Sequence, residues 1–360
     1  MAFRSGVLGA PRSRLGWFER ARARPGLLLV GGLAALLAVL VLGVGLGSVW
    51  VAPDETVAIL VRRLLGLDLG LSWSPAAETI VVDLRLPRVL SAMVVGLGLA
   101  VAGATFQGIL RNPLADPYVL GTASGAALGA AIGVLIPVRL MLLEFGLVQA
   151  LAFVGALLAV AVVYRFSRTG PLAPLTSLLL TGYAVGSLLA AGLAMTMYLS
   201  GTNLRQIFFY LLGGFDGSSW LRLGLTTPIV IVASGAILVR ARVLNGFLLG
   251  EEAAAHLGID VRRERAILLG LASLITAAAV SISGLVGFID LVVPHVVRLV
   301  VGPNARRVLP LSALLGASLL AAADLVARLL GDIPVGVVTA IIGAPFFLAL
   351  LRRTRSGYEL

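Results

Sequence analysis

The strongest constraint on the fold is a succession of apolar runs, each close to the length of a membrane-spanning helix. A hydrocarbon core about 30 Å thick is crossed by about 20 helical residues. Ten such runs can be marked, and the boundary at Gly284 and Gly287 is the least distinct. Their approximate limits are 27–50, 87–110, 118–137, 141–164, 175–198, 223–240, 266–283, 285–301, 308–329 and 334–351. We therefore predict an all-α fold, a polytopic membrane protein with about ten transmembrane helices.

Composition agrees with a membrane protein. Of the 360 residues, 59% are hydrophobic and 12% are charged, whereas an ordinary soluble protein has roughly 25% charged residues. All 28 basic residues are arginine, and the chain contains no lysine and no cysteine. These two absences exclude several kinds of chemistry.

Without lysine the chain lacks the residue that a P-loop uses to reach nucleotide phosphates, and it cannot form a Schiff base. Without cysteine it has no disulfide, thiolate nucleophile, iron–sulfur cluster or cysteine-bound zinc. The two histidines, His256 and His295, are too few for a histidine-rich metal site. The arginines lie between apolar runs and form no continuous basic patch, which argues against nucleic acid. We expect no enzyme activity, no cofactor and no resident metal.

The arginines indicate the orientation in the membrane. Ten spans place both termini on the same side, and cytoplasmic segments carry an excess of basic residues. Twenty arginines fall on the side of the termini and eight on the other side. We therefore expect cytoplasmic tails at 1–26 and 352–360, flanking a single transmembrane domain at 27–351. A cleaved signal peptide is the alternative for the first run, but that run is longer than the usual 7–15 apolar residues and lacks a clear A-x-A site.

Two segments between the spans stand out. Residues 51–86 form the longest outer stretch and lead into the sequence RLPR at 85–88. Residues 241–265 form the longest inner stretch and contain LGEEAAAHLG at 249–258. Glutamates near a helix N-terminus and a glycine after its end are typical helix boundaries. We predict a short helix there, which would form a docking surface on the cytosolic side.

Six segments, in this order along the chain, resemble the permease subunits of ATP-binding-cassette importers for iron chelates, haem and cobalamin. The resemblance covers nearly the whole chain. It departs at Asp290, where the family favours a small residue, and at Tyr210, where tryptophan is common. The segments are RLPR at 85–88, QGILRNPLADPYVLG at 107–121, LRQIFFYLLGG at 204–214, LGEEAAAHLG at 249–258, GFIDLVVPHVVRL at 287–299 and IPVGVVTAIIGAPFFLALLRR at 333–353.

The resemblance implies a set of partners. It implies a homodimer in the cytoplasmic (inner) membrane of a bacterium or archaeon, surrounded by membrane lipid, with a substrate pathway along the two-fold axis. Two cytosolic ATP-binding-cassette ATPase subunits and an external substrate-binding protein would complete the importer. The substrate would be a metal chelate, a ferric siderophore first and haem or cobalamin next. A separate ATPase fits a chain that has no P-loop lysine.

The resemblance also implies three groups of site residues. The residues that would dock the binding protein are Arg85, Arg88 and Arg328. The residues that would couple to the ATPase are Gly250, Glu251, Ala255, Leu257 and Gly258. The residues of the cytosolic gate would be Asn112, Leu114, Leu175 and Thr176.

Each group has a purely structural alternative. The arginines at 85 and 88 lie just outside the second run, one helical turn apart, and could reach lipid headgroups. Arg328 could be neutralised by Asp324, four residues earlier. The segment at 249–258 could be a solvated loop helix. The loop at 112–117 could be a turn, because its two prolines and its asparagine favour one.

Polar groups at membrane depth suggest competing functions. Gln107, Asp290 and His295 lie near membrane depth, where a polar side chain suggests a functional site. They could equally cap broken helices. An ion-coupled secondary transporter would use intramembrane carboxylates, for which Asp290 and Asp324 are the candidates. A structural or assembly membrane protein is a third alternative, and it predicts no substrate-dependent stimulation of a partner ATPase.

Overall fold

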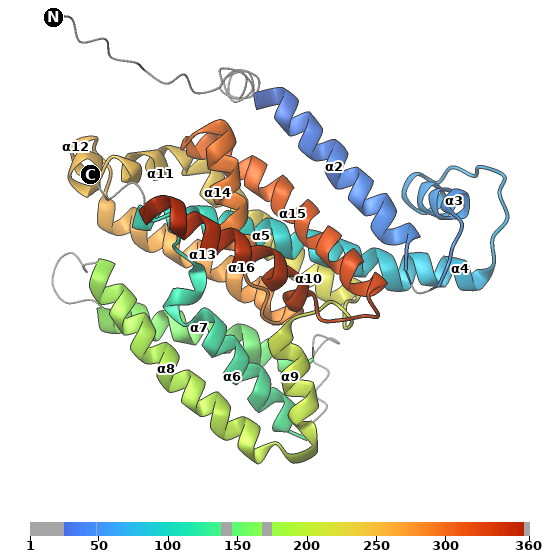
Figure 1. Ribbon diagram of the computed structural model, residues 1–360, viewed down its shortest axis with the longest axis horizontal. Coiled ribbons are helices and arrows are strands. Elements are labelled where there is room, and N and C mark those ends of the chain that lie inside the picture. The colour runs from blue at the N-terminus through green and yellow to red at the C-terminus, as the bar shows by residue number, and fades with distance from the viewer. Residues whose placement is uncertain (1–24, 48, 138–145, 168–174, 356–360) are drawn as a thin grey trace, which may run out of the picture.

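The computed structural model describes residues 25–47, 49–137, 146–167 and 175–355. The regular elements of these ranges are all helices (Figure 1). The expected N-terminal tail up to residue 24, the start of the fourth run and the last five residues lie outside them. The helices are α2 (Pro25–Gly45), α3 (Pro53–Leu65), α4 (Pro75–Thr79), the π-helix η1 (Ile80–Arg85), α5 (Leu86–Leu110), the 3₁₀ helix η2 (Pro117–Leu120), α6 (Thr122–Leu135), α7 (Leu147–Ser167), α8 (Leu175–Leu199), the 3₁₀ helix η3 (Gly201–Asn203), α9 (Leu204–Leu212), α10 (Trp220–Val239), α11 (Ala241–Leu248), α12 (Glu251–His256), α13 (Val261–Ser283), α14 (Ile289–Val301), α15 (Ala305–Leu329) and α16 (Val335–Arg355).

Each of the ten expected runs contains a helix, but the helices differ in length. Seven of those described are long and apolar enough to cross a membrane. They lie at Gly26–Gly45, Pro75–Leu110, Leu147–Ser167, Thr176–Leu199, Trp220–Val239, Val261–Ser283 and Ala305–Leu329. The apolar helices in the third and tenth runs are shorter, Thr122–Leu135 and Val335–Leu350. The eighth run contains only the 13 residues of α14.

Backbone breaks shorten two of these helices. The third run loses its first residues to η2, because Gly121, at φ +78°, separates η2 from α6. Around the start of the eighth run, Gly284 and Phe288 have φ values of +65° and +70°. These left-handed conformations interrupt a helix, so residues 284–288 form no helix and α14 begins only at Ile289.

The second run begins earlier than the sequence indicates. The helical stretch extends from Pro75 to Leu110, 36 residues in all, instead of beginning near residue 87. At 1.5 Å per residue it is about 54 Å long, longer than the hydrocarbon core of about 30 Å. The π-helix at Ile80–Arg85 lies inside this stretch. The outer part of the helix can therefore extend beyond the membrane.

α5 is the buried centre of the bundle. Its small residues allow close helix contacts, as its sequence predicts. A Cβ on Gly96 would lie 2.2 Å from the carbonyl oxygen of Gly316 in α15, and a Cβ on Gly103 would lie 1.8 Å from the carbonyl oxygen of Asp290 in α14. Neither glycine can be replaced without moving a neighbouring helix.

The two ends of the bundle carry different structures (Figure 1). α3 and α4 lie beyond one end, and the short helices α11 and α12 lie at the opposite end. We call these the α3 end and the α12 end. Because α11 and α12 lie within the segment expected in the cytosol, the α12 end corresponds to the expected cytosolic side.

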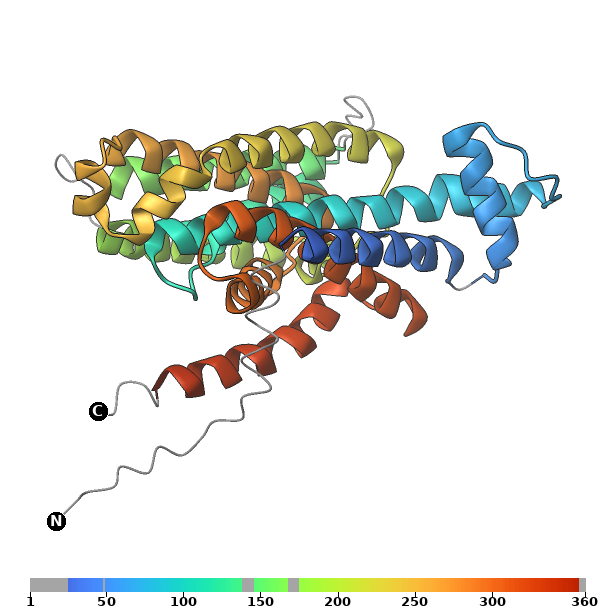
Figure 2. The same ribbon diagram turned by 90° about the horizontal axis from the view of Figure 1, so that it is seen from above.

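α8 and α16 are poorly covered by the rest of the chain. Only 11% of the apolar window of α8 is buried, compared with 83% for the helix at Pro75–Leu110. Large side chains on these helices, such as Tyr183, Leu188 and Ile341, are exposed. In Figure 2, α16 diverges from the bundle. These surfaces face either lipid or another chain.

Candidate functional sites

The three arginines predicted to dock a binding protein lie together at the α3 end. Arg85, Arg88 and Arg328 line one cavity of about 230 Å³. Asp216, from the loop between α9 and α10, and Asp332, from the loop between α15 and α16, line it too. Gly47 and Val49, which follow α2, line it as well, so the cavity joins four parts of the chain that are distant in sequence. We call these three arginines, with Asp216, Asp324 and Asp332, the arginine cluster.

Arg88 is the centre of the cluster. Its Nη1 atom lies 2.7 Å from Asp216 Oδ1 and 3.7 Å from Asp332 Oδ1, and its Nη2 atom lies 3.0 Å from Asp324 Oδ1. Its Nε donates to both oxygens of Asp324, at 3.1 and 3.2 Å. One guanidinium thus contacts three carboxylates, of which Asp324 is fully buried and the other two are more than half exposed.

Arg328 is buried and paired inside the chain. Its Nε donates to Asp324 Oδ2 at 3.1 Å, which is the contact that the four-residue spacing predicts. Its two terminal nitrogens donate to the carbonyl oxygens of Leu46, at 3.1 Å, and Gly43, at 2.8 Å. Arg328 therefore fastens α15 to the end of α2.

Arg85 also binds the end of α2 and the segment that follows it. Its Nη1 donates to the carbonyl oxygens of Val44, at 3.1 Å, and Gly45, at 2.9 Å, and its Nη2 donates to that of Val49. Burial desolvates a guanidinium, and these carbonyls replace the lost water. Of the three arginines, Arg88 retains exposed acidic partners that a binding protein could displace.

Sequence reasoning did not find Asp216 and Asp332. Both follow glycine-containing segments between helices, in the sequences GGFDG and LGDIP. The sequence does show that both are acidic residues in outer loops, and acidic residues are few in this chain, 17 in all. That signal does not identify Arg88 as the partner, because the contacts form only in the folded bundle.

The predicted helix at 249–258 is present at the α12 end. α12 spans Glu251–His256, after Gly250 at φ +110° and before Gly258 at φ +80°. These positive φ values favour glycine. The N–H of Gly258 donates to the carbonyl of Ala255 at 2.9 Å, which closes the helix. The helix boundaries predicted from the glutamates and from Gly258 are confirmed.

The residues of this segment divide into two groups. Ala255, Leu257 and Gly258 are exposed, and Leu257 has 65% of its surface exposed. Glu251 instead pairs with the buried Arg265 at the start of α13. The first three can touch a partner, while Glu251 holds α12 against α13. We call the exposed three the coupling surface.

The predicted gate loop is a turn built by its own side chains. Asn112 Oδ1 accepts from the N–H of Leu114 at 2.9 Å, and Asp116 Oδ1 accepts from that of Tyr118 at 2.6 Å. Burial raises the pKa of Asp116, and the hydrogen bond from Tyr118 opposes that rise. These bonds give the loop the shape that its prolines and asparagine predict.

The loop is followed by η2, which packs against α8, the helix that begins at Leu175. A Cβ on Gly182 would lie 2.2 Å from the carbonyl oxygen of Val119 in η2. This contact lies about two turns into α8, deeper than Leu175 and the exposed Thr176. The segment after the loop therefore packs on α8, whereas contact between the loop and those two residues stays a prediction.

Polar side chains of α5 and α14 join these two helices and bond to their backbone carbonyls. Gln107 Nε2 donates to the carbonyl oxygen of Leu291 at 3.1 Å, and Arg298 donates to Gln107 Oε1 and, at 3.0 Å, to the carbonyl of Ala104. Asp290, in the first turn of α14, is fully buried. Gln107 therefore joins α5 to α14, a structural role like the capping that was one of its two expected roles.

The surroundings of Asp324 can be compared with what an ion-coupled secondary transporter needs. That alternative requires intramembrane carboxylates that can gain and release an ion. Asp324 is enclosed by Arg88 and Arg328, which balance its charge. An ion that binds Asp324 would have to displace a guanidinium, so the pairing disfavours this residue as a coupling site.

The sequence of the chain is similar to those of known transport proteins. The model of the FecCD transport family matches residues 35–353. The cobalamin import system permease protein of Halobacterium salinarum is 46% identical over 273 residues, which cover 76% of this chain and 73% of that protein. The hemin transport system permease protein of Yersinia pestis is 39% identical over 279 residues, covering 76% of this chain and 83% of that protein.

Structural similarity agrees with these sequence matches. A solved structure, described as an inward-facing conformation of a metal-chelate type ABC transporter, superposes with a TM-score of 0.78. It is 30% identical and covers 90% of this chain and 98% of that one. The family match covers most of the chain, including the arginine cluster and the coupling surface. The chain therefore belongs to the FecCD transport family.

Proposed function

We propose that the chain is the membrane-spanning permease subunit of an ATP-driven importer that translocates a metal chelate by alternating access. As a member of the FecCD transport family it is a transport permease and not a catalytic subunit. The observation that carries the proposal is the coupling surface, an exposed apolar surface beside the short helix α12 at one end of the bundle. It offers an ATPase a place to act on a chain that has no P-loop lysine.

The permease functions as a homodimer in the cytoplasmic membrane, with both termini in the cytosol. The exposed faces of α8 and α16 support a second copy as their cover, because exposed apolar surface of this extent marks an interface or lipid contact. A two-fold axis also matches a symmetric pair of ATPase subunits. The arginine distribution supports the cytosolic assignment of the α12 end.

The three groups of residues carry separate roles in this proposal. The coupling surface, with Gly250 and Glu251 shaping α12, transmits ATPase closure. Arg88 receives acidic residues of the external binding protein, and Arg85 and Arg328 keep its surroundings in place. The loop with Asn112 and Leu114, together with the start of α8 at Leu175 and Thr176, forms the cytosolic gate. Docking by Arg88 is supported by its exposed acidic partners, which a binding protein could replace.

The cargo is proposed as a class. From the sequence we expect a ferric siderophore as the first cargo and haem or cobalamin next. The two relatives named above, however, are permeases for cobalamin and hemin. These names support a metal chelate without supporting that order. Cobalamin is the first cargo to test, because the relative that is 46% identical is a cobalamin permease.

Reconstitution tests the proposal. The chain is placed in liposomes with its ATPase subunit and binding protein, and uptake of cobalamin, haem and a ferric siderophore is measured with and without ATP. We expect uptake of one of them only with ATP and both partners. Uptake driven by an ion gradient without the ATPase would establish the secondary transporter instead. Assembly of the complex without substrate-dependent ATPase stimulation would support a structural role.

A further inference from the structure

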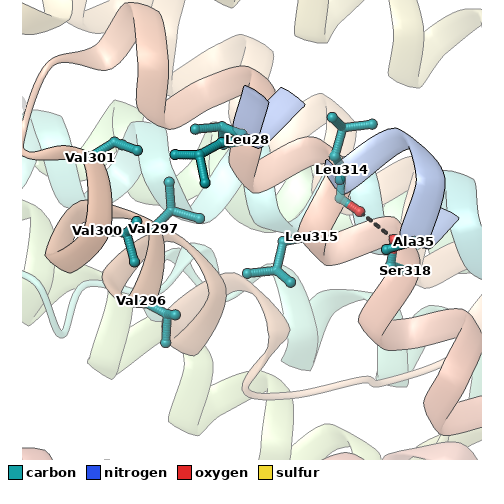
Figure 3. A pocket seen from close by; sticks show the side chains of 11 residues that line it. Leu28, Ala35, Val296, Val297, Val300, Val301, Leu314, Leu315 and Ser318 are labelled. Atoms are coloured by element: carbon teal, nitrogen blue, oxygen red, sulfur yellow. Dashed lines mark hydrogen bonds between the residues drawn. The ribbon is translucent and has the colours of Figure 1, made fainter. Parts of the chain in front are cut away.

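An apolar groove lies between α2, α14 and α15 (Figure 3). Its volume is about 210 Å³, larger than the engineered apolar cavities of about 150 Å³ that bind benzene. Leu28 lines it from α2, Val297 and Val300 from α14, and Leu314 and Leu315 from α15. The transport function gives no role to this groove.

The lining favours an apolar occupant. Figure 3 shows aliphatic side chains of the three helices facing one another across the groove. The hydroxyl among them, that of Ser318, donates to the carbonyl of Leu314 at 2.8 Å. Water in a cavity requires two to four polar partners, and among the residues that line the groove Ser318 alone has a polar side chain. An acyl chain of the bilayer is already in hydrocarbon, so van der Waals contact with these side chains, and not transfer from water, would hold it in the groove.

The groove lies near the α12 end of the bundle. Leu28 is one turn after the start of α2, and Val301, which also lines the groove, is the last residue of α14. The start of α15 is attached to α11, because the N–H of Ala305 donates to Asn245 Oδ1 at 2.8 Å. One end of the groove therefore lies at the membrane boundary on the α12 side.

A basic residue lies at that boundary on the same face of α15. Arg307 precedes Leu311 by four residues and Leu314 by seven, and both leucines line the groove. Residues at these spacings share a helix face. Arg306, the residue before it, is exposed. An apolar groove with a basic residue on the same helix face, toward the α12 end, matches a molecule that has an acyl tail and an anionic head.

We propose that this groove binds one acyl chain of a phospholipid from the leaflet at the α12 end, with the lipid phosphate beside Arg307. α2 supports a lipid rather than a protein occupant, because only 11% of its apolar window is buried and Leu27 and Val30 are exposed. The groove is thus open to the same hydrocarbon that surrounds α2. The proposal depends on the membrane location and not on transport or cargo.

Photochemical cross-linking tests the site. The chain is reconstituted without ATPase in nanodiscs that contain phosphatidylglycerol with a diazirine on one acyl chain. We expect mass spectrometry to find labelled peptides from α14 and α15 that contain Val300 and Leu315. A label spread evenly over all exposed helices, or no label on these two peptides, would overturn the proposal. This measurement on the unaltered chain requires no variant to fold.

Two variants sharpen the test. Leu315→Trp fills the groove and should lower labelling at Val300 severalfold, because the indole takes the space of the acyl chain. Leu329→Trp, on an exposed position at the other end of α15, is the matched control and should leave it unchanged. Arg307→Gln should lower labelling by phosphatidylglycerol about threefold. A phosphatidylcholine that carries the same diazirine has no net charge, and its labelling should fall less. Equal labelling in Leu315→Trp and the unaltered chain contradicts the site.

Discussion

The arginine cluster and the coupling surface lie at opposite ends of the bundle, and they use their residues in opposite ways. In the arginine cluster, guanidinium groups contact carboxylates and carbonyls of the same chain, and Arg85, Arg328 and Asp324 are buried. In the coupling surface, Ala255, Leu257 and Gly258 are exposed, and Leu257 presents an apolar side chain to solvent. At the α3 end most of the charged groups are paired within the chain, whereas at the α12 end an exposed surface is available to a partner.

This difference separates stability from function. A buried carboxylate between two arginines contributes to folding, because removing one member leaves buried charge without compensation. Exposed residues contribute little to folding, so a substitution in the coupling surface should act on transport. The following substitutions test that separation, beginning with the largest expected effect on the free energy of unfolding.

Asp324→Ala should have the largest effect. It removes the carboxylate shared by Arg88 and Arg328 and should lower the free energy of unfolding by about 3–5 kcal/mol. The midpoint of thermal unfolding in nanodiscs, followed by tryptophan fluorescence, measures the loss. Asp332→Ala is the control, because Asp332 is half exposed and lies 3.7 Å from Arg88. Equal midpoints for the two variants would show that the cluster does not stabilise the fold.

Glu251→Ala should have a smaller effect. It removes the carboxylate that pairs with the buried Arg265, which should cost about 1–3 kcal/mol. Because this contact holds α12 against α13, we expect faster hydrogen exchange in residues 250–258 and weaker ATPase binding. Glu252→Ala, at the neighbouring exposed position, is the control. Unchanged exchange in Glu251→Ala would mean that α12 is held by other contacts.

Gly258→Val should cost about 1–2 kcal/mol, because a side chain at φ +80° is strained. Its effect on uptake should be much larger: ATP hydrolysis continues while uptake is lost. Gly258→Asn tolerates this backbone conformation and separates backbone strain from contact with the ATPase. Gly270→Val, at an exposed glycine of α13 with space around it, is the matched control. Normal uptake in Gly258→Val would remove this residue from the coupling role.

Asp216→Asn should have the smallest effect on stability. The pair with Arg88 has a carboxylate that is 67% exposed, and such pairs contribute about 0.2–1 kcal/mol. The substitution frees one side of Arg88, so the association rate of an acidic binding protein should rise at low salt. Surface plasmon resonance at two salt concentrations measures that rate. A slower association would show that Asp216 itself contacts the binding protein.

Local features of the molecule could be predicted from the sequence. The ten helical runs follow from apolar length, and α12 follows from Glu251, Glu252 and Gly258, since helix boundaries depend on residues within a few positions. The contact of Arg328 with Asp324 could also be predicted, because the two residues are one helical turn apart.

Features that depend on distant contacts could not be predicted. Arg88 meets Asp216 across 128 positions and Asp324 across 236, and sequence spacing carries no signal at those separations. The start of the long helix at Pro75 was missed because residues 75–86 include Glu78, Asp83 and Arg85, which a search for apolar runs passes over. The late start of α14 depends partly on Phe288 at φ +70°, a conformation that non-glycine residues rarely adopt.

The backbone contact between Gly96 and Gly316 has a consequence for motion. α5 and α15 touch through their backbones, with a carbonyl oxygen of the other helix against the Cβ position of each glycine, so the two helices cannot slide past each other without breaking this contact. They should move as one rigid body during a transport cycle, while α8 and α16, which touch less of the chain, change position. Spin labels on α5 and α15 should keep one distance distribution in all nucleotide states, and a label pair between α5 and α8 should show at least two.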